Sequence, residues 1–293
     1  MSVKETCSRL SANLLRKIPD EMYVKLKYRV KMGKKLNLEN PVTFSEKIQW
    51  LKINACNPLY TQLVDKYEVR KFVAEKIGEE HLIPLVGGPW ERVEDIEFDK
   101  LPKQFVIKCN HDSGGLVICD DKEKLDLDDV KKKLTSALKS DYYLRSREWP
   151  YRDVKRKIIA EKYMVDESEV ELKDYKLFVF AGKVHYIEVD YNRYISHHRN
   201  FYSTDWTYVP FTTNYPTNPD YVIEKPKCLD EMIRCAEYLT KEAGNPPFLR
   251  VDFYVIDEQF YFGEITFYHA SGYSKFTPPE YDLKFGELMG KIK

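Results

Sequence analysis

Apolar positions along the chain switch between the three- to four-residue period of helices and the two-residue period of strands. Thr43-Phe44-Ser45-Glu46 has the form of a capping box, and the spacing of Phe44, Ile48 and Leu51 predicts a helix that continues to about Asn54. The same periodicity predicts further helices at residues 63–77, 130–138 and 229–243; Gly78 follows the first and Gly244 the last.

Strand patterns alternate with these helices. Residues 177–180 and 184–189 flank a turn at 181–183, and residues 248–256 and 260–267 flank a turn at 257–259. Shorter apolar runs at 82–86, 105–107 and 158–160 also suit strands. Helices and hairpins are mixed without regular β-α-β alternation, which predicts an α+β fold built around antiparallel sheets.

The second strand pair carries two facing carboxylates. A turn centred on Glu258 places Asp252 opposite Glu264 and Arg250 opposite Thr266 on one face, about 5 Å apart at Cβ. The other face is apolar and holds Val251, Phe253, Val255, Tyr261, Ile265 and Phe267. Because like charges repel there, a hard cation such as Mg²⁺ between the acids is expected. The alternative is a solvated acid pair with Arg250 as counter-ion, if the register slips by one residue.

A second motif joins a strand to a small-residue loop. The apolar run 105–107 ends in Lys108, and Ser113-Gly114-Gly115 follows a few residues later. A lysine at this point can project its charge toward phosphates, and a Ser-Gly-Gly turn can leave backbone N–H groups free to bind an anion. Taken alone, an ordinary polar hairpin explains this motif equally well.

Together the motifs resemble ATP-grasp enzymes. The hairpin resembles the metal hairpin of D-alanine–D-alanine ligases, although Thr266 stands where those usually have Asn. Asp174-Tyr175-Lys176 followed by Arg193 resembles the ribosomal-protein glutamate ligases. As an ordered set, five segments are similar to the TupA-like ATP-grasp family of teichuronopeptide biosynthesis: 43–47, 65–70, 105–111, 174–176 and 269–272.

The apolar pattern predicts a helical N-terminal segment (residues 1–60), and the resemblance, which covers about residue 40 to the end, implies an ATP-grasp domain (61–293). The two lobes of this domain, about 61–160 and 161–293, would clasp ATP. The resemblance also implies ATP and Mg²⁺ as cofactors. The residues implied to contact the nucleotide are Lys108, Ser113, Gly114, Gly115, Glu161, Lys162, Tyr163, Met164, Asp174 and Lys176. Asp252 and Glu264 would bind Mg²⁺, and Arg250 the acyl phosphate. Arg193 and Arg199 could form a carboxylate pocket, or be surface charges.

The implied activity is a carboxylate–amine ligase that forms an amide through an acyl phosphate in surface-polysaccharide modification. Its partners would be a sugar acid or amino acid and an amine, with peripheral contact to a membrane-linked glycan. One rival is a glycosyltransferase that uses Asp126-Leu-Asp128; however, its place before helix 130–138 favours a helix cap. Another rival is a non-catalytic nucleotide- or glycan-binding module.

Composition adds a few limits. The 47 basic and 47 acidic residues balance, so no nucleic-acid partner is expected. No apolar run reaches the roughly 18 residues of a membrane span. The six cysteines form no C-x-x-C, which predicts reduced thiols and a cytoplasmic location. The first 35 residues hold ten basic and three acidic residues on a predicted helix, for which a solvated face is favoured over a membrane or polyanion contact.

Overall fold

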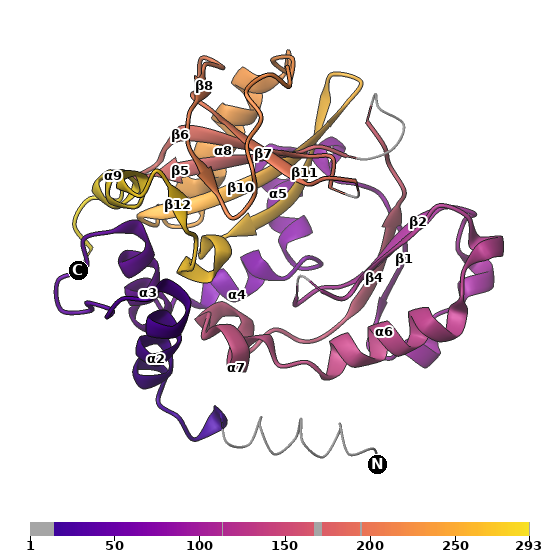
Figure 1. The fold of residues 1–293 in the computed structure, drawn as a ribbon. Coiled ribbons are helices and arrows are strands. Elements are labelled where there is room, and N and C mark those ends of the chain that lie inside the picture. Colours follow the sequence, from indigo (N-terminus) through magenta and orange to yellow (C-terminus); the bar gives the residue numbers. More distant parts are fainter. Residues whose placement is uncertain (1–14, 113, 167–171, 194, 293) are drawn as a thin grey trace.

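Two antiparallel sheets organise the computed structural model, which describes residues 15–112, 114–166, 172–193 and 195–292 (Figure 1). The smaller sheet has the order β1-β4-β2-β3 and contains β1 (Leu85–Trp90), β2 (Phe105–Cys109), β3 (Leu116–Cys119) and β4 (Ile158–Lys162). Helix α6 (Leu127–Lys139) covers one face of this sheet, because Val130 and Leu134 pack at helical spacing against Phe105 and Ile107.

The larger sheet has the order β11-β10-β5-β6-β7-β8. Its strands are β5 (Asp174–Phe180), β6 (Lys183–Tyr191), β7 (His198–Tyr202), β8 (Tyr208–Val209), β10 (Phe248–Ile256) and β11 (Gln259–Thr266). A separate pair joins β9 (Thr212–Thr213) to β12 (Phe276–Thr277). Along β10, Leu249, Val251 and Phe253 enter the largest hydrophobic core, so that Arg250 and Asp252 point to the opposite face.

The remaining α-helices pack around the core of the larger sheet or lie beside elements that do. They are α2 (Asp20–Met32), α3 (Phe44–Asn54), α4 (Pro58–Val64), α5 (Val69–Ile77), α7 (Tyr142–Ser146), α8 (Leu229–Glu242) and α9 (Glu280–Leu288). Short 3-10 turns are η1 (Glu79–His81), η2 (Val93–Asp95), η3 (Phe98–Lys100), η4 (Lys122–Lys124), η5 (Trp149–Arg152) and η6 (His269–Gly272). The capping box of α3 is confirmed, since Thr43 and Glu46 bond reciprocally. Phe44 then packs edge-on against Phe248 and Phe285, which ties α3 to the core of the larger sheet.

Two predicted elements differ from the structure. The helix expected at 63–77 is interrupted, because Asp65 Oδ1 accepts hydrogen bonds from the backbone N–H groups of Tyr67 (2.8 Å) and Glu68 (3.1 Å). Such local bonds compete with helical ones, so α4 ends at Val64 and α5 begins at Val69. The strand expected at 82–86 begins only at Leu85.

The β10–β11 register is confirmed at the charged end and corrected at the turn. Asp252 pairs with Glu264 as predicted. However, the turn is the two-residue Asp257-Glu258, with φ of 49° and 66°, so the pairing is displaced until a bulge at Gly263 restores it. Tyr261 consequently leaves the expected core face, where Phe260 and Phe262 are buried instead.

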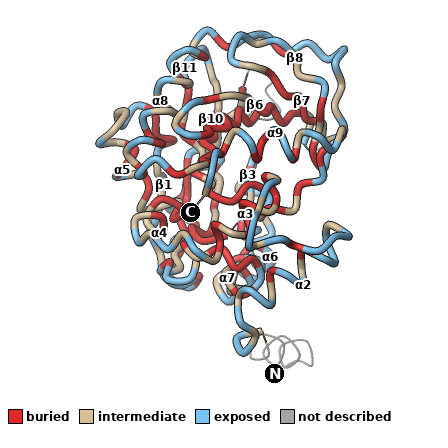
Figure 2. Tube along the Cα trace, turned by 90° about the vertical axis from the view of Figure 1, so that its left-hand side faces the viewer, coloured by how far each residue is buried: buried red, intermediate tan, exposed pale blue. Residues whose placement is uncertain are grey.

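Burial is deepest along β5, β6, β7 and β10 of the larger sheet and along β2 and β4 of the smaller one (Figure 2). The outer strands β1 and β3 are more exposed. Among the described residues, no helix combines the length and the apolarity needed to span a bilayer. The cysteines that the structure describes are free thiols, and Cys7 lies outside the described residues.

Candidate active site

A row of charged side chains crosses four neighbouring strands of the larger sheet. In register it runs from Glu264 on β11 through Asp252 on β10 and Lys176 on β5 to Glu188 on β6. Directly opposite residues have Cβ atoms about 5 Å apart. This row therefore contains one lysine and three acids. Further positive charge nearby is needed to offset the repulsion between the carboxylates.

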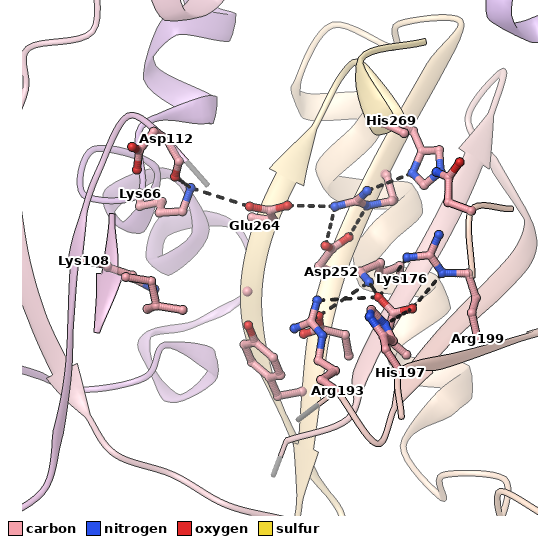
Figure 3. A pocket seen from close by; sticks show the side chains of 18 of the residues that line it. Lys66, Lys108, Asp112, Lys176, Arg193, His197, Arg199, Asp252, Glu264 and His269 are labelled. Carbon is pink, nitrogen blue, oxygen red and sulfur yellow. Dashed lines mark hydrogen bonds and ion pairs between the residues drawn. The ribbon is translucent and has the colours of Figure 1, made fainter. Parts of the chain in front are cut away.

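Arg250 supplies that charge to the hairpin acids Asp252 and Glu264, which are labelled in Figure 3. Its Nε and Nη2 donate to the two oxygens of Asp252, both at 2.7 Å, and Nη2 also donates to Glu264 Oε1 at 2.8 Å. Burial raises the pKa of Asp252 to about 7 despite Arg250. Burial also opposes ionisation of Glu264, but Lys66 and Arg250 outweigh it and lower the pKa of that carboxyl to about 2. The facing acids thus differ strongly in proton affinity.

His269 supports Arg250 from the other side. Its Nδ1 lies 2.9 Å from Arg250 Nη1. A guanidinium only donates, so Nδ1 accepts and the ring proton belongs on Nε2, which lies 4.0 Å from Glu188 Oε2. Burial first, and then Arg250, Arg199 and Lys176, lower the pKa of His269 well below its ordinary value, so the ring is neutral.

Lys176 is the centre of an acidic cluster on β5 and β6. Its Nζ pairs with Asp190 and lies 3.3 Å from Glu188 and 3.5 Å from Asp174. Burial alone would lower the pKa of Lys176, but the three carboxylates raise it above its ordinary value. Only 5% of Lys176 is exposed, so its charge acts on the cavity from just beneath the surface.

The two arginines predicted to form a carboxylate pocket both meet this cluster. Arg199 is buried, and its donors are used by Asp190 (2.7 Å), by Glu188 (3.0 Å) and by Thr213. Arg193 Nη1 lies 2.6 Å from Asp174, and 35% of the Arg193 side chain is exposed. Arg193 is therefore the more accessible of the two.

The smaller sheet contributes Lys108 from the end of β2. Lys108 Nζ lies 2.6 Å from Glu161 Oε2, and Arg70 Nη1 lies 3.5 Å from the other oxygen of Glu161. In the loop that follows, the Gly115 N–H donates to Asp112 Oδ1 at 2.9 Å, so that amide is already occupied. Gly114 is exposed, and Ser113 lies outside the described residues.

Lys66 links the two sheets across the cavity. Its Nζ donates to the Asp112 carbonyl at 3.0 Å and lies 3.7 Å from Glu264 Oε2 (Figure 3). The loop that carries Lys66 is anchored where Asn110 Nδ2 donates to Asp65 Oδ2 at 2.8 Å. The interruption between α4 and α5 therefore positions a cation opposite the carboxylate hairpin.

These groups line two neighbouring cavities. The larger, of about 640 Å³, is bounded by Lys66 and Lys108 on one side and by the hairpin and the acidic cluster on the other. The smaller, of about 140 Å³, is largely apolar and is lined by Ile83, Val106, Lys108, Leu116, Ile118, Glu161, Lys162, Tyr163, Met164, Val165, Leu172, Arg193 and Tyr254. It includes Glu161, Lys162, Tyr163 and Met164, four of the residues that the resemblance implies contact the nucleotide. Lys108, Leu116, Arg193 and Tyr254 border both cavities.

The hairpin acids have the donor chemistry of a magnesium site. Within the described part of the chain, no group of three or more His, Cys, Asp or Glu side chains is arranged to hold a metal. Asp252 and Glu264 nevertheless offer carboxylate oxygens on one face, and Mg²⁺ commonly combines one or two carboxylates with substrate phosphates and water.

The Asp126-Leu-Asp128 segment, by contrast, belongs to a helix cap. Asp126 accepts hydrogen bonds from the backbone N–H groups of Asp128 and Asp129, which confirms it as the cap of α6.

Comparison with known proteins decides the family. The profile of the TupA-like ATPgrasp family matches residues 46–290, which is most of the chain. The chain belongs to this family. The fold is accordingly an α+β ATP-grasp fold, with the two antiparallel sheets facing the cavity. A search of curated proteins finds no match.

Several solved structures are similar to this TupA-like ATP-grasp chain. D-alanine–D-alanine ligase from Bacillus anthracis complexed with ATP is 19% identical with a TM-score of 0.38, covering 74% of this chain and 55% of the ligase. N5-carboxyaminoimidazole synthetase from Staphylococcus aureus complexed with ADP is 14% identical with a TM-score of 0.43, and the match covers 70% of this chain and 44% of the synthetase. Biotin carboxylase from Campylobacter jejuni, in its beta-gamma-ATP complex, is 13% identical with a TM-score of 0.46, and the match covers 85% of this chain and 53% of the carboxylase. The chain thus spans about half the length of these proteins.

Several residues of the candidate site were not predicted from the sequence. Glu188 and Asp190 are fully buried, and His197 lies 3.1 Å from Asp190 with its ring against Tyr215. A signal for the two acids was present, because they alternate with the buried Ile187 and Val189 along β6. For Tyr215 we find no comparable signal, since long-range folding brings it to the cavity.

Proposed function

We propose that this chain is an ATP-dependent carboxylate–amine ligase that works through an acyl phosphate. The supporting observation is the arrangement of the two cavities. A cavity of about 640 Å³, lined by Lys66, Lys108 and Arg250 and by two facing carboxylates, continues into an apolar cavity of about 140 Å³. The aliphatic and aromatic side chains that line the smaller cavity suit a base, and the lysines and arginines of the larger one suit a polyphosphate. This combination suits ATP.

In the proposed reaction, a carboxylate oxygen of the substrate forms a bond to the γ-phosphorus of ATP while the bond from that phosphorus to the bridging oxygen breaks, and ADP leaves. An amine then attacks the carbonyl carbon of the acyl phosphate, inorganic phosphate leaves with the electrons of the C–O bond, and the amine loses a proton. Lys108, Lys176 and Arg250 stabilise the charge on the transferring group.

The remaining predicted residues take supporting roles in this proposal. Mg²⁺ held by Asp252 and Glu264 would neutralise phosphate charge. Gly114 and Gly115 would border the phosphates, Asp174 the ribose or metal, and residues 161–164 the adenine. Ser113, outside the described residues, stays a prediction from the resemblance. Arg193 contacts the substrate carboxylate. Arg199 stays a predicted substrate residue, but its contacts suggest that it acts by supporting Asp190 and Glu188.

The substrate classes rest on the family resemblance. We propose a sugar acid or an amino acid as the carboxylate, an amine as the acceptor, cytoplasmic ATP as the phosphoryl donor, and a role in surface-polysaccharide modification that brings the chain to membrane-linked glycans. The glycosyltransferase alternative loses its local support, because Asp126 is engaged as a helix cap.

A nucleotide-dependent ADP-release assay tests this function. Purified protein with Mg-ATP would be given pairs of sugar acids or amino acids with amines, and ADP would be measured by a coupled assay. Thermal shift with Mg-ATP and with UDP-sugars runs in parallel. ADP release that requires a carboxylate, with stabilisation by Mg-ATP alone, is expected. Stabilisation by UDP-sugars instead of ATP would contradict the proposal.

A further inference from the structure

Helix α2 presents an uncovered apolar row at the molecular surface. Met22, Leu26 and Val30 follow one another at four-residue spacing and are 54%, 62% and 75% exposed. The row is not needed for docking the helix, because the opposite face holds Val24 and Tyr28, both fully buried. Exposed single apolar residues are ordinary, but a row along one helix face indicates a contact surface.

The opposite side of α2 is firmly attached to the protein. Tyr23 Oη donates to the Arg145 carbonyl at 2.8 Å, and Val24 and Tyr28 share a hydrophobic cluster with Leu36. Figure 1 shows α2 at the edge of the molecule, beside α3. The outward face is therefore held in a fixed orientation by its own packing.

Basic residues accompany the apolar row. Lys25 and Arg29 are exposed and lie along one side of the row on the helix surface, with Arg16, Lys17 and Lys34 exposed near the two ends. Acids are close as well: Glu21 pairs with Lys25 at 2.5 Å, Asp141 lies 3.6 Å from Arg16, and Asp282 lies 3.5 Å from Lys34. Asp20, in the first turn of α2, is turned to Arg147 at 3.3 Å. The first 35 residues hold ten of the 47 basic residues and only three of the 47 acidic ones, so the rest of the chain is net negative. Residues 15–35, the described part of this segment, hold eight of these basic residues and two of these acids, so the segment that contains α2 is net positive.

We propose that the outward face of α2 binds the surface of an anionic lipid bilayer. Apolar side chains flanked by lysine and arginine, on a helix lying parallel to the surface, can bury the former among acyl chains while the latter meet lipid phosphates. The charges of α2 alone predict a helix face in contact with water. The exposed row of Met22, Leu26 and Val30 instead favours a partner that can bury apolar side chains. A second copy of the chain packed face to face would oppose like charges, and a nucleic acid would leave the apolar row unused.

Vesicle co-sedimentation of the full chain tests this proposal, using phosphatidylcholine alone and phosphatidylcholine with phosphatidylglycerol in equal amounts. Binding to the anionic vesicles alone is expected, weakening with salt. Lys25→Gln/Arg29→Gln should lower the affinity about 25-fold, at about fivefold for each charge. Leu26→Gln/Val30→Gln should lower it at least about tenfold. Matched controls are Lys132→Gln/Lys133→Gln on α6 and Val222→Gln, all exposed positions, which should bind like the parent chain.

Unfolding temperature and Mg-ATP affinity, measured on each variant, verify that the fold is intact. These two readouts separate the membrane proposal from the ligase proposal. Equal binding to both vesicle types would overturn the membrane proposal. So would control variants that bind as weakly as the α2 variants, or a Leu26→Gln/Val30→Gln variant with unchanged vesicle affinity. A concentration-dependent dimer that this variant abolishes would assign the face to a second copy, and RNA binding that exceeds vesicle binding would assign it to a polyanion.

Discussion

Asp252 lies directly opposite Glu264 on neighbouring strands, and one nitrogen of Arg250, Nη2, donates to both carboxylates at 2.7 and 2.8 Å. The guanidinium thus occupies the place between the acids where the sequence predicts a metal. For Mg²⁺ to bind there, Arg250 must give up part of these contacts. It would then be free to interact with the transferring phosphoryl group, while His269 continues to accept from Nη1.

Removing either hairpin acid should abolish most of the activity. Asp252→Ala and Glu264→Ala are each expected to lower ADP release by about two to three orders of magnitude, because a catalytic metal contributes several kcal/mol to transition-state stabilisation. Calorimetric titration should show weaker Mg-ATP binding. Glu75→Ala, on the exposed side of α5, is the matched carboxylate control. Unchanged Mg-ATP affinity and turnover in both hairpin variants would exclude the metal assignment.

Lys108 should matter for nucleotide binding more than for folding. Its only described salt-bridge partner is Glu161, which keeps Arg70 when Lys108 is removed. Lys108→Ala should therefore weaken ATP binding about tenfold to a hundredfold, the loss expected for hydrogen bonds to a charged group, with little change in circular dichroism. Lys103→Ala, at an exposed position before β2, is the control. An unfolded Lys108→Ala protein would instead identify Lys108 as a structural residue.

Local patterns predicted much of the fold and part of the site. The α3 cap, the α6 cap and the pairing of Asp252 with Glu264 depend on neighbouring residues, and all are present in the structure. The predicted turn was one residue too long, and the bulge at Gly263 shifts the pairing back by one residue. The pairing of Asp252 with Glu264 was therefore predicted correctly, although the predicted register near the turn was wrong. Lys66 and His269 could not be assigned, because their roles depend on contacts to Glu264 and Arg250 from distant segments.

Arg193 and Arg199 should respond differently to substitution. Arg199→Ala leaves the fully buried Asp190 and Glu188 short of a partner, and the free energy of unfolding should fall by about 3–5 kcal/mol. Arg193→Ala removes a partly exposed side chain and should change stability by about 1 kcal/mol or less while strongly reducing turnover. Denaturant unfolding and ADP release distinguish the two. Equal destabilisation by both substitutions would contradict the assigned difference.

His269 should make the protein sensitive to acid. Its pKa in the folded state lies well below the value of about 6.5 expected when unfolded, so the unfolded chain binds the proton first. Well above pH 6.5 the free energy of unfolding is unaffected, and it falls as the pH drops through 6.5. The full loss is about 1.4 kcal/mol for each unit by which the folded and unfolded pKa values of His269 differ. His269→Gln retains an acceptor for Arg250 but cannot titrate, so its free energy of unfolding should fall less between pH 7 and pH 5. Parallel pH profiles would refute this assignment.

Isotope transfer tests the acyl phosphate most directly. The carboxylate that supports ADP release would be labelled with ¹⁸O in its carboxyl group and incubated with the protein, Mg-ATP and the amine, and the released phosphate would be analysed by mass spectrometry. The proposed reaction predicts one ¹⁸O atom in each phosphate, because a carboxylate oxygen attacks the γ-phosphorus and leaves with it. Phosphate without label, or product formed from a nucleotide sugar with no ATP consumed, would contradict the ligase mechanism.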